Sequence, residues 1–160
     1  MKTVTRLTAI PENSVITSGF GKIDYSDTYC AVKETDETAE EIAARVLKLP
    51  KWANWLMNIR DAIVRIFRLK TSTEILQEHQ GFPIISQHEN EFVSGENDKH
   101  LDYRLSILVD RENSSIYFTT IVHFNNFLGR LYFLPVKPFH KVIVKTILKR
   151  EIMPSVQRAV

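Results

Sequence analysis

The segment from Phe82 to Val93 carries the residues whose types and spacing are best suited to contact a ligand. Ser86, His88 and Asn90 occupy every second position, so in a β-strand they would share one face. The alternative register would turn two carboxylates towards an apolar interior, which costs far more than burying a neutral imidazole and an amide. We therefore expect this polar strip to face the interior, with residues 94–97 forming the next loop.

A short polar strip on an apolar wall is typical of small-molecule sites; the alternative is that His88 and Asn90 lie near a rim and are only hydrated. His88 is the candidate general base of an enzymatic alternative, but no carboxylate is placed beside it, so the sequence predicts no catalytic dyad. The five histidines lack the spacing of a metal site. No glycine-rich phosphate loop occurs, and we expect neither a metal nor another cofactor.

The wall itself is predicted by period-two segments in the last third of the chain. Leu101–Val109, Ile116–Phe124 and Phe127–Pro135 alternate apolar and other residues, which predicts three antiparallel strands. Asn125-Asn126 fits a two-residue turn, because asparagine tolerates the positive φ angles of such turns. A segment of helical period, Phe139 to Ile152, follows and is expected to cover the sheet.

The two hairpins fix the faces of these strands. The first would pair Val109 with Ile116 and Leu105 with Thr120; the second would pair Phe124 with Phe127. Both give the same apolar face, formed by Leu101, Tyr103, Leu105, Ile107, Val109, Ile116, Phe118, Val122, Phe124, Leu131 and Phe133. The other face would be in contact with water and would carry Asp102, Arg104, Ser106, Thr119, His123 and Arg130. Tyr103 and Thr120 would thus join the ligand wall, opposite Ile143 of the final helix.

The first half of the chain supplies an arm, a strand and two helices. Residues 1–20 are expected to be an extended arm, and Ile23 to Lys33 reads as a strand. Thr38 and Glu41 have the spacing of a capping box, which starts a helix that ends at Pro50. A second helix would begin near Pro50, and its apolar stripe includes Trp55, which we expect in the core or as a lid over the ligand.

Composition limits the class of protein. The 160 residues predict one domain, 1–160. A net charge of +2 gives no argument for nucleic acid. Cys30 is the single cysteine, which favours a reducing compartment. No leader peptide and no membrane-spanning segment is seen, so we expect a cytoplasmic protein.

One cationic surface is predicted on the final helix. Lys137, Lys141, Lys145 and Lys149 recur every fourth residue. This basic ridge is expected to be a solvated face, with a weak anionic partner or membrane surface as the alternative.

The order of elements resembles the helix-grip fold of the START-like superfamily, which includes the polyketide cyclases. A strand is followed by two helices, a run of antiparallel strands and a long final helix. The segments Gly129–Tyr132, Val136–His140 and Trp52–Asp61 are similar to a bacterial family of unknown function in that superfamily. Some members of this family are fused behind a dehydrogenase-like dinucleotide-binding domain; this chain lacks that domain, so no redox role is inferred.

The resemblance covers residues 20–152, which are expected to be the core of the domain, and it implies an α+β fold in which a curved antiparallel sheet grips the final helix around a cavity. The superfamily includes binders and enzymes, so the fold does not choose between them. The expected function is binding of an apolar or amphipathic molecule by Ser86, His88, Asn90, Tyr103, Thr120, Trp55 and Ile143. A cyclase-like or hydrolytic enzyme, or an interaction module that uses the basic ridge, is the alternative.

Overall fold

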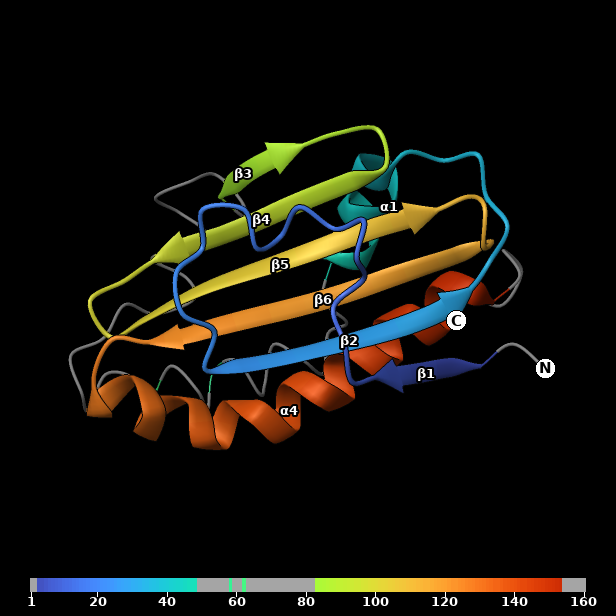
Figure 1. Ribbon diagram of the computed structural model, residues 1–160. Coiled ribbons are helices and arrows are strands. Elements are labelled where there is room, and N and C mark those ends of the chain that lie inside the picture. Colours follow the sequence, from blue (N-terminus) through green and yellow to red (C-terminus); the bar gives the residue numbers. More distant parts are fainter. Residues whose placement is uncertain (1–2, 49–57, 59–61, 63–82, 154–160) are drawn as a thin grey trace.

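The computed structural model describes residues 3–48, 58, 62 and 83–153. In chain order the described elements are β1 (Val4–Leu7), β2 (Tyr25–Val32), α1 (Ala39–Val46), β3 (Ile84–Gln87), β4 (Glu91–Asn97), β5 (Leu101–Asp110), β6 (Ser115–Phe124) and α4 (Phe127–Ile152). The strands of the described residues form one antiparallel six-stranded sheet in the order β1-β2-β6-β5-β4-β3. The α+β class, with a long C-terminal helix against an antiparallel sheet, is confirmed (Figure 1).

The central hairpin has the register predicted from its apolar pattern. Val109 lies opposite Ile116, and Leu105 lies opposite Thr120. β2 then adds to the other side of β6 and brings Tyr29 and Ala31 onto the same face. Helices α1 and α4 cover this face (Figure 1). The main core consists of its residues and of the apolar sides of the helices: Tyr29, Ala31, Ala39, Ile42, Ala43, Val46, Phe92, Ile107, Val109, Ile116, Phe118, Val144, Ile147, Leu148 and Ile152.

Helix α1 begins at the capping box seen in the sequence. The Thr38 hydroxyl accepts from the Glu41 amide, and the Glu41 carboxylate accepts from the Thr38 amide, so two free N–H groups are satisfied. The helix ends at Val46. The second predicted helix lies outside the described residues, except for Asn58 and Ala62, which are helical.

The prediction of a third strand at Phe127–Pro135 is wrong, because these residues form the first part of α4. Asn126 does not form a hairpin turn but caps the helix, and its side chain accepts from the Gly129 amide at 3.1 Å. Pro135 and Pro138 lie inside the helix, although each removes one internal hydrogen bond. The predicted pairs of the second hairpin therefore do not exist.

Tertiary contacts decide that Phe127–Pro135 is helical, because its apolar residues fit the period of a strand as well as that of a helix. Gly129 is buried so closely against the loop before β5 that a Cβ atom would lie 2.0 Å from the backbone oxygen of His100. The side-chain nitrogen of Asn126 also donates to the Lys99 carbonyl at 3.0 Å. The start of α4 is thus held by a loop that lies far away in the sequence.

The opposite face of the sheet is covered as well, which corrects the expectation of a face in contact with water. The chain from Thr8 to Asp24 crosses this face in front of β4, β5 and β6 (Figure 1). Ile16 packs there on Val93 and Ile121. Ser106 and Thr119 are buried, and the Arg104 guanidinium donates to the carbonyls of Ile16 and Ser18.

The predicted single strand 82–93 is also wrong. The chain reverses at residues 88–90, so that β3 and β4 form a hairpin closed by the His88 amide and the Glu91 carbonyl. Asparagine favours such turns, and a period-two pattern does not reveal them. A bulge between Ile84 and Ser86 then places Ser86 opposite Val93, and β4 continues through 94–97, where a loop was expected.

Candidate functional site

Alternate residues of β2 bring polar side chains onto the apolar face that α4 covers. Tyr25, Asp27 and Tyr29 share that face, because side chains alternate along a strand. Thr120 of β6 lies opposite Asp27. His140, from the middle of α4, completes the group. We call these five residues the inner polar cluster.

The imidazole of His140 joins the helix to the sheet within this cluster. Its Nε2 lies 3.0 Å from Oγ1 of Thr120 and 3.4 Å from Oδ1 of Asp27. The Tyr25 hydroxyl donates to Oδ2 of the same carboxylate at 2.7 Å. A carboxylate beside one ring nitrogen orients the imidazole and favours a proton on that nitrogen.

Two atoms of the inner polar cluster have no hydrogen-bond partner within the part of the chain that the structure describes. They are Oδ1 of Asp27 and the hydroxyl of Tyr29. Asp27 is 2% exposed and Tyr29 is 0% exposed. An unsatisfied buried polar group costs about 1–3 kcal/mol, and native proteins contain few of them. The cluster therefore has unused hydrogen-bonding capacity on two neighbouring side chains of one strand.

Apolar and aromatic side chains surround the cluster. The Phe118 and His140 rings lie 6.4 Å apart between centroids. Phe133 packs on Tyr25 at 4.8 Å and on Phe124 at 5.4 Å. The His140 side chain keeps 17% of its surface exposed, so the cluster is connected to solvent. An apolar wall with a few fixed polar groups is suited to an amphipathic small molecule.

The electrostatics favour a charged carboxylate between two neutral phenols. Burial alone would raise the pKa of Asp27, but the adjacent His140 ring and the Tyr25 hydroxyl hold that pKa below its ordinary value. Burial, together with the Asp27 carboxylate, raises the pKa of Tyr25 and of Tyr29. Asp27 is therefore a buried anion on this face at neutral pH.

The residues predicted to bind a ligand separate into two groups. Tyr103 and Thr120 lie on the face that α4 covers, and Ile143 packs against the core there. Trp55 lies outside the described residues. Ser86, His88 and Asn90 do not form the predicted strip: Ser86 takes the face of Val93, and the other two are exposed at the β3–β4 turn. Ligand contact by these residues, and the cavity between sheet and helix, stay predictions.

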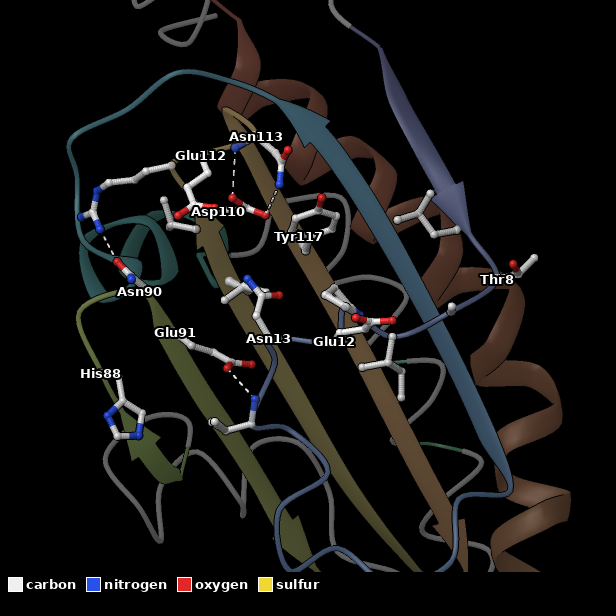
Figure 2. A pocket seen from close by; sticks show the side chains of 18 residues that line it. Thr8, Glu12, Asn13, His88, Asn90, Glu91, Asp110, Glu112, Asn113 and Tyr117 are labelled. Atoms are coloured by element: carbon white, nitrogen blue, oxygen red, sulfur yellow. Dashed lines mark hydrogen bonds between the residues drawn. The ribbon is translucent and has the colours of Figure 1, made fainter.

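His88 and Asn90 instead line a groove on the opposite side of the sheet (Figure 2). The groove has a volume of about 1010 Å³. One wall is the arm from Leu7 to Asn13, and the other consists of the start of β4 and the β5–β6 turn with Tyr117. Among the described residues, no carboxylate bonds to the His88 ring, so the general base expected at this position has no partner to orient it.

The main polar groups of this groove bind one another. The buried Glu91 carboxylate accepts from the Ser14 hydroxyl at 2.5 Å, the Val15 amide at 2.7 Å and the Ser106 hydroxyl at 2.5 Å. Asp110 accepts from both nitrogens of Asn113 (Figure 2). These bonds hold the arm and the turn in place. They also occupy the Glu91 and Asp110 carboxylates, whereas Oδ1 of Asp27 and the Tyr29 hydroxyl on the other face have no hydrogen bond among the described residues.

The basic ridge of α4 is only partly a free surface. Lys145 and Lys149 are exposed, whereas Lys137 and Lys141 are half-buried. The Lys137 ammonium lies 5.1 Å from the centroid of the Tyr25 ring, within the range of a cation–π contact. Binding of an anionic surface by this ridge stays a prediction.

Sequence reasoning missed Asp27 and His140, the carboxylate and the imidazole of the inner polar cluster. Asp27 left a signal, because it stands between two tyrosines that share its face of the expected strand Ile23–Lys33. A carboxylate on a core-facing position is unusual. His140 left none, since helical period alone does not show which strand the ring will meet.

Within the described residues, no helix is long and apolar enough to cross a membrane. The same residues contain no group of three or more histidine, cysteine or acidic side chains that could hold a metal ion.

Comparison with known proteins gives a family and nothing more specific. The model of a family described as protein of unknown function, DUF2867, matches residues 20–147. No curated protein and no solved structure gives a significant match.

Proposed function

The chain belongs to the DUF2867 family of unknown function, and we propose that it binds an apolar or amphipathic small molecule on the face of the sheet that α4 covers. The inner polar cluster would hold the polar end of this molecule, and the surrounding aromatic side chains would contact its apolar part. The likeness of the element order to the START-like helix-grip fold supports an internal site of this kind. The single cysteine fits action in the cytoplasm.

One observation carries the proposal: Oδ1 of Asp27 and the Tyr29 hydroxyl are buried and have no hydrogen-bond partner among the described residues, and apolar side chains surround their cluster. A molecule that supplies the missing hydrogen bonds would recover the free energy that these groups lose on burial. The groove under the arm lacks this feature, because its buried carboxylate, Glu91, is bonded to the arm, and Asp110 is bonded to Asn113 of the turn.

Native mass spectrometry of gently purified protein, combined with a titration of the neutral fluorophore Nile red, tests the proposal. We expect saturable binding of one equivalent. The variant His140→Trp, which places a larger ring over the cluster, should weaken binding at least about tenfold. The matched control His88→Ala, at the exposed turn on the other side, should bind like the wild type. A folded protein that carries no small molecule and does not bind the dye saturably would contradict the proposal.

Acid–base catalysis on an apolar substrate, of the hydrolytic or cyclase-like kind, is a second candidate function. The observation that favours it is the position of His140 Nε2 between Thr120 and Asp27. With the proton held on Nε2, Nδ1 would be the acceptor for a substrate proton. If a substrate is found, His140→Gln should bind it but lose turnover, whereas His88→Ala should keep both; equal turnover in His140→Gln would exclude this role.

A further inference from the structure

The hydrogen bonds that are missing from the inner polar cluster restrict the chemistry of its ligand. Oδ1 of Asp27 is an acceptor without a well-formed hydrogen bond, and the Tyr29 hydroxyl lacks any hydrogen-bond partner in the described part of the chain. The two residues stand two positions apart on β2 and point to the same face. A single ligand group between them would therefore meet one strong acceptor and one hydroxyl.

Neighbouring side chains satisfy Oδ1 only in part. Tyr25 has a single hydroxyl proton and donates it to Oδ2. His140 Nε2 lies 3.4 Å from Oδ1 but closer, at 3.0 Å, to the hydroxyl of Thr120. Oδ1 thus retains most of its capacity to accept a hydrogen bond, and a bond to a charged acceptor is among the stronger kinds.

The negative charge of Asp27 also favours a ligand group that donates a hydrogen bond. Asp27 is ionised and its side chain has no exposed surface. The cationic or potentially cationic side chains that act on it are His140 on α4 and Arg6 on β1. A second anion beside this carboxylate would be repelled in surroundings that screen charge poorly.

We infer that the polar end of the ligand is a hydrogen-bond donor, a hydroxyl or an amine, and not a carboxylate. A hydroxyl fits both partners, since it can donate to Asp27 and accept from Tyr29. An amine satisfies Asp27 and adds an opposite charge. A carboxylate could accept from Tyr29 but would meet Asp27 as a like charge. This inference rests on the proposed function and specifies the class of molecule for the same site.

Competition among ligands with equal alkyl chains tests the inference. Dodecanol, dodecylamine and dodecanoate would each be used to displace Nile red from the full-length protein, below their aggregation concentrations. We expect dodecanol and dodecylamine to displace the dye at concentrations about 10- to 100-fold lower than dodecanoate, the range of one charge-assisted hydrogen bond gained or lost.

Substitutions assign the preference to the cluster. In Asp27→Asn the preference against dodecanoate should fall at least about tenfold, because the amide has no charge and can donate. Tyr29→Phe keeps the charge of Asp27 and should weaken the binding of dodecanol several-fold. This variant provides a second test if Asp27→Asn does not fold. The control Glu112→Gln neutralises a carboxylate in the groove on the other side and should keep the wild-type preference.

The outcomes separate the inference from the proposal beneath it. If dodecanoate displaces the dye as well as dodecanol, the inference is wrong while the binding function stands. If the preference is unchanged in Asp27→Asn and in Tyr29→Phe, these groups are hydrated and do not contact the ligand, which also overturns the inference. If no dye binds to the folded protein, the proposed function itself fails.

Discussion

Replacement of Gly129 by alanine should destabilise this protein, although the same change in an exposed helix is stabilising. Within α4, alanine gains about 1 kcal/mol over glycine from helix propensity. The added Cβ, however, would lie 2.0 Å from the backbone oxygen of His100 and 2.9 Å from its carbonyl carbon. Cβ contacts below 3.0 Å are essentially never seen, so helix and loop must separate by about 1 Å. Neither neighbour is a flexible side chain.

Because the two nearest neighbours are backbone atoms, forced expansion of this contact should cost about 2–3 kcal/mol, the upper part of the usual range of about 1–3 kcal/mol. After subtraction of the propensity gain, we expect a net loss of roughly 1–2 kcal/mol in the free energy of unfolding. Urea unfolding followed by circular dichroism measures this loss, provided that the m value stays constant. The control Gly21→Ala, whose Cβ would meet nothing within 4 Å, should change stability by no more than about 0.5 kcal/mol. A Gly129→Ala protein as stable as the wild type would refute this account of how α4 meets the sheet.

Two further predictions concern charge. Burial opposes the ionisation of Glu37, but its contacts with Arg45 and Lys33 lower its pKa to about 2, and these two cations also lower the pKa of the buried Glu151. A carboxylate with a lowered pKa stabilises the fold at pH values above its unfolded pKa. The free energy of unfolding should therefore fall as the pH drops from about 4.5 towards 2. A urea midpoint that is constant over this range would contradict the assigned contacts. If the basic ridge binds anionic surfaces, the double variant Lys141→Glu, Lys145→Glu should lose salt-sensitive sedimentation with phosphatidylglycerol vesicles, and wild-type protein that never sediments with them would remove the role of the ridge.

Local patterns were sufficient where neighbouring residues decide the structure. Thr38 and Glu41 form the capping box because its partners stand three residues apart. The β5–β6 register follows from the apolar alternation, since a shift by one residue would turn every core side chain towards the other face. The strand Ile23–Lys33 was found for the same reason, and the structure has it at Tyr25–Val32.

Local patterns failed where a distant contact decides. Phe127–Pro135 is apolar at most positions, so its period did not separate strand from helix; the loop at His100 and the cap at Asn126 do so in the folded chain. The turn at residues 88–90 was hidden within an apparently regular strand, and with it the predicted polar strip was lost.

The candidate site shows the same division. The sequence by itself determined which face of the central strands is apolar, and it placed Thr120 on the wall that α4 covers. It also contained a carboxylate at a core-facing position, Asp27. Only the tertiary structure brought His140 from α4 to that carboxylate, because the direction of a helix across a sheet depends on packing summed over many side chains. The arm that covers the other face was decided in the same way: its anchor, the contact of Glu91 with Ser14 and Val15, joins residues 76 and 77 positions apart, a separation that no periodic pattern can report.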